Sequence, residues 1–229
     1  MISRLQQWFG NGWMGIVNLL ITVLCVFLSL SIHEFFHGYA AYKLGDGTAK
    51  YMGRLNLKPS SHLDPIGAIC LFLFGFGWAN PVPVNPGNFK IKNRKLGMVI
   101  TSLAGPVSNL LLAFVSLLLL NVMNLFFYNE TGVLDSAVSV LNAVFISLVY
   151  LNIGLAVFNL LPIPPLDGYK ILSAVLPGRI YFKIMQYERY GFIILLLILN
   201  LPIFSNLLLV AQSGIIRFYI GIIELLPFF

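Results

Sequence analysis

Charged residues are scarce in this chain: Asp, Glu, Lys and Arg make up only 10% of its 229 residues. Soluble domains typically carry roughly 25%. Hydrophobic residues reach 59%, and the mean hydropathy is +0.89. So little charge beside so much apolar surface excludes an ordinary soluble domain. It indicates a polytopic membrane protein, which has the lipid bilayer as its partner.

Cysteine is rare as well. The two cysteines, Cys25 and Cys70, both stand in apolar stretches. One such pair provides neither a disulfide framework nor a C-x-x-C metal site, so we interpret both as packing residues. The sequence also lacks internal repeats and low-complexity tracts, which excludes repeat architectures. No loop between the apolar runs is long enough to hold a soluble accessory domain.

The long apolar runs predict about five transmembrane helices. A helix of about 20 apolar residues crosses a hydrocarbon core of about 30 Å. The stretch Ile66–Ala79 is too short for this, is rich in glycine and is followed by prolines, so we expect a re-entrant or interfacial segment. The sequence thus predicts an all-α polytopic membrane protein, with spans at 14–42, 96–127, 136–161, about 190–201 and 203–216.

The net charge of +6 comes from basic residues that cluster in the short loops 43–64, 90–95 and 162–189. This is the positive-inside pattern of a membrane protein rather than a phosphate-binding face, so we expect no nucleic acid as a partner. The acidic loop 128–135 has no Lys or Arg and is expected outside. We therefore predict a multi-pass protein of the cell membrane, with its amino terminus outside, its carboxyl terminus inside and residues 218–229 at the interface.

A pentad of unusual composition lies inside the first apolar run: His33-Glu34-Phe35-Phe36-His37. Ionisable side chains are costly in hydrocarbon and usually mark a functional site there. On a helix, residues four apart lie on the same face, so the two imidazoles can bind one zinc ion. Glu34 lies beside them as a candidate general base for a water molecule that the metal activates.

Two histidines leave a catalytic zinc site incomplete, because such sites usually have three protein ligands. The candidates for the third are His62, Asp64 and Asp167. Asp167 follows three prolines at the end of the 136–161 run, and the predicted topology places it at the depth of the two histidines. Asp167 could instead cap the following helix. His62 and Asp64 are more typical of a turn, in which Asp64 binds nearby backbone.

Three motifs together resemble the site-2 proteases, a family of intramembrane zinc metalloproteases. In chain order they are His33-Glu34-x-x-His37, Ala104-Gly105-Pro106-Val107-Ser108-Asn109 and Asn159-x-x-Pro162-x-x-Pro165-Leu166-Asp167-Gly168. The resemblance covers about Leu24 to Leu172 and is to a compact form without an inserted soluble domain. It implies that 1–229 is a single integral-membrane metalloprotease domain. A three-helix catalytic core would lie within about 14–172, and additional helices within 173–229.

The same resemblance implies roles for individual residues. One zinc ion per chain would be held by His33, His37 and Asp167, near the cytoplasmic side, with Glu34 activating water. Asn109 would steady the substrate or the developing oxyanion. The residues leave another role open for Asn109, which is an interhelical hydrogen bond, with Gly105 serving only helix packing.

The implied activity is that of a zinc endopeptidase that cleaves transmembrane segments of membrane protein substrates. A helical substrate must be unwound locally, and the proline-rich stretch Pro81–Pro86 could present an extended edge to it. Two alternatives are a metal or proton transporter and an inactive relative that binds membrane helices. The absence of a twofold repeat disfavours the first, and the presence of Glu34 disfavours the second.

Overall fold

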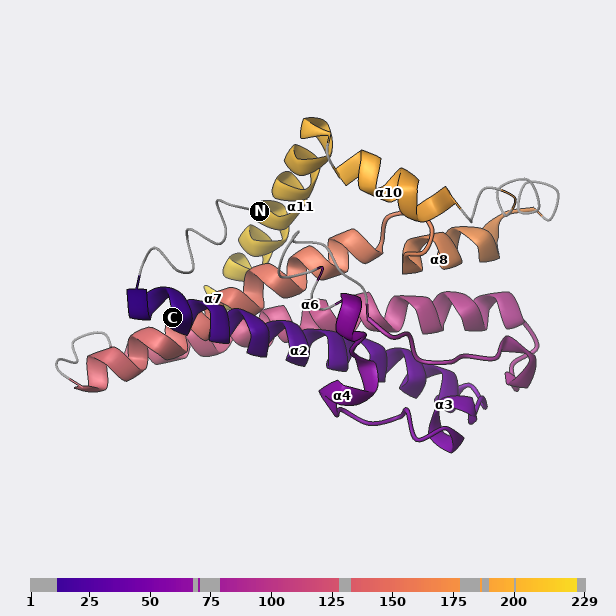
Figure 1. Ribbon diagram of the computed structural model, residues 1–229, viewed down its shortest axis with the longest axis horizontal. Coiled ribbons are helices and arrows are strands. Elements are labelled where there is room, and N and C mark those ends of the chain that lie inside the picture. Colours follow the sequence, from indigo (N-terminus) through magenta and orange to yellow (C-terminus); the bar gives the residue numbers. More distant parts are fainter. Residues whose placement is uncertain are drawn as a thin grey trace.

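The structure is a computed structural model that describes residues 12–67, 70, 79–127, 133–177, 186, 190–199 and 201–225. Within these residues the chain consists of helices and the loops that connect them (Figure 1). The pairing of extended backbone in this part is a single antiparallel bridge between Leu63 and Ala79. The prediction of an all-α fold is confirmed for the described residues.

In the part of the chain that the structure describes, four helices are long and apolar enough to cross a membrane. They are α2 (Gly12–Lys43), α6 (Arg94–Phe127), α7 (Val133–Asn159) and α11 (Pro202–Ile223). At 1.5 Å per residue even α11, the shortest, extends about 33 Å, which exceeds the hydrocarbon core of about 30 Å. They correspond to the runs predicted at 14–42, 96–127, 136–161 and 203–216.

The fifth predicted span is not confirmed. Its described part is α10 (Gly191–Leu199), whose nine residues extend about 14 Å. The expected re-entrant segment Ile66–Ala79 lies largely outside the described residues. The last helix is longer than expected, because it continues past Arg217 to Ile223. The exposed Arg217 side chain does not interrupt the helix, since arginine is a good helix former and can extend along its surface.

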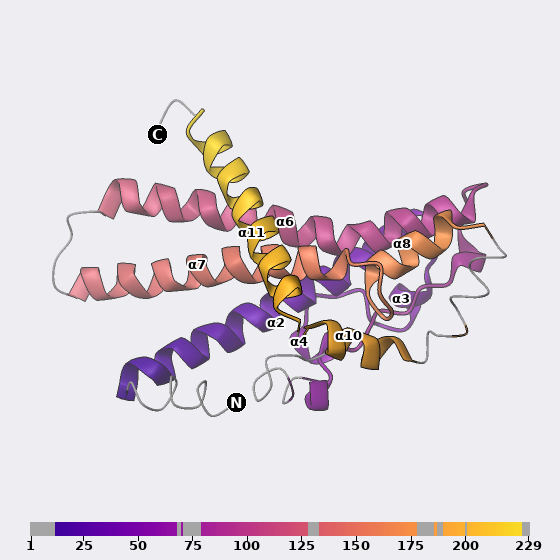
Figure 2. The same ribbon diagram turned by 90° about the horizontal axis from the view of Figure 1, so that it is seen from above.

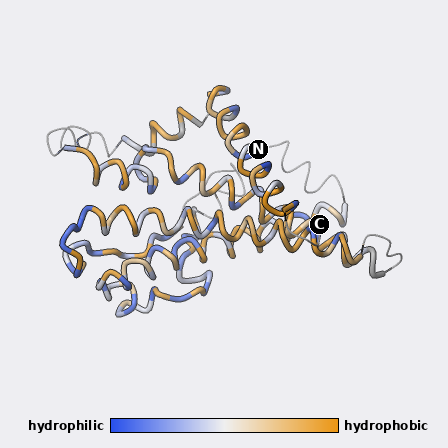
Figure 3. The backbone as a smooth tube through the Cα atoms, turned by 180° about the vertical axis from the view of Figure 1, so that it is seen from behind, coloured by the Kyte–Doolittle hydropathy of each residue, from blue (hydrophilic) through white to orange (hydrophobic). Residues whose placement is uncertain are grey.

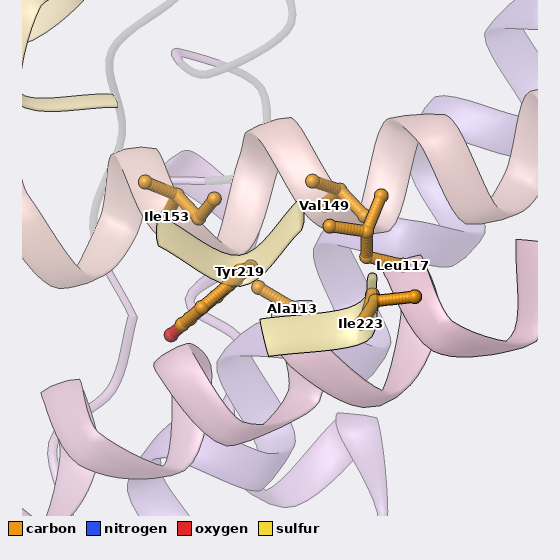
Figure 4. Packing of buried hydrophobic residues seen from close by; sticks show 6 residues of the cluster. All are labelled: Ala113, Leu117, Val149, Ile153, Tyr219 and Ile223. Carbon is orange, nitrogen blue, oxygen red and sulfur yellow. The ribbon is translucent and has the colours of Figure 1, made fainter. Parts of the chain in front are cut away.

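The helices α2, α6 and α7 pack against one another, and α11 crosses α6 and α7 (Figure 2). The contact with α11 is made by aliphatic side chains and one tyrosine: Ala113, Leu117, Val149, Ile153, Tyr219 and Ile223 (Figure 4). A second apolar cluster joins α2 to α7 through Ile21, Cys25 and Leu148. Cys25 is therefore a packing residue, as predicted, and Cys70 is half-buried; both are free thiols.

Much of the apolar surface faces outward. In the apolar stretches of the four long helices, between 6% and 33% of the residues are buried inside the molecule. Exposed leucines such as Leu20, Leu24 and Leu111 would be unfavourable in water but suit hydrocarbon. Figure 3 shows this apolar colour along the long helices and polar colour in the loops at one end. That end holds α3 (Thr48–Tyr51), α4 (Pro59–His62) and η1 (Pro86–Asn88).

Asp46 fastens these loops to the end of α2. The helix ends at Lys43, and Gly45, with φ of +106°, turns the chain back. The buried Asp46 carboxylate then accepts hydrogen bonds from Thr48, from the Asn85 backbone N–H at 2.6 Å and from the Asn88 side chain at 3.0 Å. Burial by itself would raise the pKa of Asp46, but these hydrogen bonds outweigh it and hold the pKa below its usual value.

Replacing Asp46 by Ala is expected to lower the free energy of unfolding by about 1–3 kcal/mol, because several buried donors lose their acceptor. The lowered pKa also predicts a pH dependence. The carboxylate's contribution is complete above the unfolded pKa of about 3.9 and is lost as pH falls through the lower folded pKa. Thermal unfolding in detergent measures both effects. Asp64→Ala removes one hydrogen bond from Gly67 and serves as the control; an equal loss in both variants would contradict this account.

Candidate metal centre

His33 and His37 lie one helical turn apart on the inner face of α2. Both are buried, and their Nε2 atoms are 3.0 Å apart. Their Nδ1 atoms point away from each other toward α6. His37 Nδ1 lies 2.7 Å from the backbone oxygen of Thr101, and His33 Nδ1 lies 2.8 Å from Oδ1 of Asn109. Because a carbonyl oxygen only accepts, His37 carries its proton on Nδ1 and turns the Nε2 lone pair inward.

Asp167 joins the two histidines from the far side of the bundle. The chain leaves α7 at Asn159, passes through the proline-rich turn and starts α8 (Asp167–Val175) at Asp167 itself. Its Oδ2 atom lies 3.2 Å from His33 Nε2 and 3.0 Å from His37 Nε2, while Oδ1 accepts from Lys170 Nζ at 2.9 Å. The side chain does not cap α8, so that alternative is wrong.

The three groups fit a divalent cation. Donor atoms at about 2.0–2.1 Å from a tetrahedral zinc lie about 3.3 Å from one another, close to the separations here. If His33 carries its proton on Nδ1 as His37 does, two nitrogen lone pairs and a carboxylate oxygen converge with no proton among them, an arrangement that a cation stabilises. Within the described residues this is the group of three or more potential ligands that could share one ion, and His62 and Asp64 are not part of it.

His62 and Asp64 have structural contacts instead. The Asp64 carboxylate accepts from the Gly67 backbone N–H at 2.7 Å, as the predicted turn requires. The fully buried His62 ring lies with Nε2 at 2.7 Å from the backbone oxygen of Asn56. Both residues therefore hold the conformation of residues 56–67, which follow α3.

Gly105 leaves the space in which the centre is built. A Cβ atom at this position of α6 would overlap His37 Nε2 and would lie 2.7 Å from His33 Cε1. Real Cβ atoms are essentially never so close to other heavy atoms. The glycine therefore allows α6 to approach the two imidazoles, which is more than the ordinary helix packing considered from the sequence.

Gly105→Ala is expected to lose stoichiometric zinc binding, because the added methyl group would overlap His37 Nε2 and the His33 ring. The helix itself should not weaken, since Ala is a better helix former than Gly by about 1 kcal/mol. Metal analysis of the purified protein measures the loss. Gly214→Ala on α11 is the matched control, since its Cβ would meet nothing within 4 Å. Full zinc occupancy in Gly105→Ala would overturn this reading of the centre.

Glu34 has its hydrogen-bond partner in a different segment from α6, which contacts the two histidines. Its Oε2 atom accepts a hydrogen bond from the Val82 backbone N–H at 2.8 Å, and both residues are buried. Residues 81 and 83 are prolines and have no N–H, so Val82 offers the single backbone donor among residues 81–83. Arg54 in turn holds the stretch by donating to the carbonyl oxygens of Asn80 and Pro81. The carboxylate thus has a fixed position beside the candidate ligands.

Comparison with known proteins connects this geometry to a family. A model of the family described as peptidase family M50 matches residues 21–199, more than three quarters of the chain. The chain belongs to peptidase family M50. This membership confirms the resemblance to the site-2 proteases and the prediction of a metallopeptidase, and it agrees with zinc as the cofactor.

Relatives of this M50 peptidase bear matching names. A Bacillus subtilis (strain 168) protein, provisionally named zinc metalloprotease YwhC, is 43% identical over 81% of this chain and 83% of its own length. Rip2 of Mycolicibacterium smegmatis, also provisionally named a zinc metalloprotease, is 30% identical over 76% of this chain and 64% of its own. MJ0611 of Methanocaldococcus jannaschii, also provisionally named a zinc metalloprotease, is 29% identical over 69% of this chain and 72% of its own length. No solved structure matches the chain significantly.

Two cavities of the M50 peptidase meet at Glu34 and Asp167. The first, of about 630 Å³, lies between α2, α7 and α10, and apolar side chains including Leu30, Phe158 and Leu195 line it. The second, of about 510 Å³, extends along α6 and α8 past Thr101 and Tyr169. Both therefore give access to the candidate base and the carboxylate ligand.

Sequence reasoning gave no role to two polar residues that line these cavities. Asn159 ends α7 and lines the larger cavity, and Lys170 lines both and pairs with Asp167. Each had a signal in the sequence. Asn159 is the last polar residue before the prolines, and Lys170 stands three residues after Asp167, within reach on a helix.

Proposed function

We propose that this M50 peptidase is an intramembrane zinc endopeptidase that cleaves transmembrane segments of membrane proteins. The observation that carries the proposal is the convergence of His33, His37 and Asp167 beside Glu34, at a buried place among helices long enough to span a bilayer. Buried ionisable groups at such a depth indicate function. The names of the relatives, which specify zinc metalloproteases, support the same activity.

The proposed ligands of the single zinc ion are His33, His37 and Asp167, which supply two nitrogens and a carboxylate oxygen. Zinc, when bound, supplies a Lewis acid and lowers the pKa of water to about 7. Lys170 holds the second oxygen of Asp167, so Asp167 offers one oxygen to the ion. This leaves room in the centre for water and for the substrate carbonyl.

Glu34 is the proposed general base. It takes a proton from water and later gives it to the leaving amine of the peptide. The Val82 N–H keeps one carboxylate oxygen in place, and the other remains free for this transfer. The sequence-based role of Asn109 at the oxyanion stays a prediction, and the contacts of Asn109 favour a different role, described below.

The cavities suit a locally extended piece of an apolar chain. The lining of the larger cavity is mostly aliphatic and aromatic, as a transmembrane substrate requires. The stretch at Pro81 presents fewer edge donors than expected, because the Val82 N–H is already donated to Glu34. A substrate strand beside it would therefore bind mainly through its own N–H groups.

The centre lies near the basic end of the bundle. His37 and His33 stand six and ten residues before Lys43, which corresponds to about 9 and 15 Å along α2. Basic residues follow in the loops at that end, among them Lys50, Arg54 and Lys92. By the positive-inside rule we expect this end, and with it the active site, on the cytoplasmic side of the cell membrane.

The proposal is tested by removing and restoring the metal. Purified protein in proteoliposomes should cleave a panel of model transmembrane peptides, lose this activity on treatment with a chelator and regain it with zinc. A zinc-containing protein that cleaves no member of a broad panel would overturn the proposal. Zinc flux across the same vesicles would then favour a transporter, and tight binding of uncut peptides an inactive relative.

A further inference from the structure

Three fully buried polar side chains form a series of hydrogen bonds behind His33. Ser29 on α2, Asn109 on α6 and Asn152 on α7 are each 0% exposed. Asn109 Nδ2 donates to Asn152 Oδ1 at 2.9 Å, and Asn152 Nδ2 donates to Ser29 Oγ at 2.9 Å. Polar groups buried among apolar helices are costly unless they are paired, so this series is a specific feature. It connects three helices and ends at the His33 imidazole.

Backbone carbonyl groups set the direction of the whole series. Asn152 Nδ2 also donates to the Leu148 backbone oxygen at 2.8 Å, and a carbonyl oxygen can only accept. The NH₂ group of Asn152 therefore faces its own helix, and Asn152 Oδ1 faces Asn109. The Ser29 hydroxyl donates to the Cys25 backbone oxygen at 2.7 Å, which leaves Ser29 Oγ as an acceptor for Asn152.

The orientation of Asn152 decides the tautomer of His33. Because Asn109 presents its NH₂ group to Asn152, its Oδ1 atom faces His33 Nδ1 at 2.8 Å. An oxygen there requires the proton on Nδ1. A neutral imidazole carries one proton, so the Nε2 lone pair is directed toward His37 and Asp167.

We propose that Asn152, acting through Asn109, is a positioning residue that holds His33 in the Nδ1–H tautomer required for metal binding. This inference rests on the proposed metal centre. His37 needs no such device, because its Nδ1 partner is the Thr101 backbone oxygen, which cannot turn. A side-chain amide can turn over and present NH₂ instead of oxygen to His33. Asn152 prevents this turn by accepting from the Asn109 NH₂ group.

The test replaces Asn152 by Leu, which removes the acceptor and has a similar size. Asn109 is then free to turn, and its NH₂ group favours the Nε2–H tautomer of His33, in which a proton occupies the ligand position. Zinc affinity, measured by competition with a chelator, is expected to fall about 10–100-fold, as is typical when a partner behind a metal ligand is lost. Asn142→Leu is the matched control, since Asn142 also bridges α7 to α6, through Asn124.

Tautomers are read directly in the metal-free protein labelled with ¹⁵N-histidine, because the chain has only three histidines. Wild type and Asn142→Leu should show His33 as Nδ1–H, and Asn152→Leu should show an added Nε2–H population. Asn109→Asp still offers an oxygen to His33 and should retain both tautomer and affinity better than Asn109→Leu. This comparison remains informative if Asn152→Leu folds poorly.

The outcomes separate this inference from the proposed function. If wild type binds zinc and cleaves, yet Asn152→Leu keeps both the Nδ1–H tautomer and wild-type zinc affinity, the positioning role is wrong and the peptidase stands. If Asn142→Leu and Asn152→Leu lose zinc affinity equally, the positioning role is also wrong. The loss would then be a general effect of removing an interhelical hydrogen bond. If wild type binds no zinc, the proposed centre itself fails.

Discussion

Glu34→Gln is expected to abolish most peptide cleavage while the protein keeps its zinc. The amide has the size of the carboxylate and can still accept from the Val82 N–H, so the side chain should stay in place. It cannot take a proton from water. Removal of a positioned general base typically costs 10²- to 10⁴-fold in rate, and we expect a loss in kcat within this range of about 10²- to 10⁴-fold.

The measurement compares kcat and zinc content of purified wild type and Glu34→Gln on one transmembrane peptide. Tyr51→Phe is a suitable control, because it removes one hydroxyl group from an exposed side chain of α3 that lines neither cavity. Cleavage by Glu34→Gln at the wild-type rate would show that another group serves as the base. Loss of zinc from this variant would assign Glu34 to the metal instead.

Asp167→Ala is expected to have the largest effect on metal binding. The variant keeps two imidazoles but loses the carboxylate oxygen that lies 3.0–3.2 Å from their Nε2 atoms. Loss of a partner behind a ligand costs about 10–100-fold in affinity, so loss of the ligand itself should exceed about 100-fold. Lys170 would also lose its partner, but its side chain is 44% exposed and can reach water.

Thermal unfolding with and without zinc provides a second measurement on the same variant. A ligand that binds the folded state stabilises it by mass action, so zinc should raise the unfolding temperature of wild type but not of Asp167→Ala. Asp64→Ala changes a carboxylate outside the centre and should respond to zinc as wild type does. Full zinc occupancy in Asp167→Ala would show that the third ligand is misassigned.

The sequence predicts the local part of the site well. The spacing of His33 and His37 determines their common face on a helix, and the polar pentad in an apolar run indicates function without any knowledge of the fold. Asp167 required one further step, which was the matching of depths between two predicted spans. The four long spans follow from length and hydropathy alone. Their predicted ends lie within three residues of the helix ends, except at the carboxyl end of α11.

Other parts of the site depend on packing that a linear pattern does not contain. The Thr101 carbonyl and the Val82 N–H are backbone groups. Every residue has the first and every residue except proline has the second, so the sequence does not single out these two positions. Asn152 belongs to no motif, and its role exists only because α6 and α7 bring it beside Asn109. In the sequence Asp46 is typical of an ordinary turn. In the structure it accepts hydrogen bonds from Asn85 and Asn88, some forty residues further along the chain.

Hydrolysis is proposed to take place within the membrane at this centre. It is tested most directly by reconstituting zinc-loaded wild type with a transmembrane peptide in lipid vesicles and mapping the cut bond by mass spectrometry, with Glu34→Gln in parallel. We expect a cut inside the apolar segment, toward its cytoplasmic end, by wild type alone. A cut confined to the water-exposed flanks, or equal cleavage by Glu34→Gln, would contradict it.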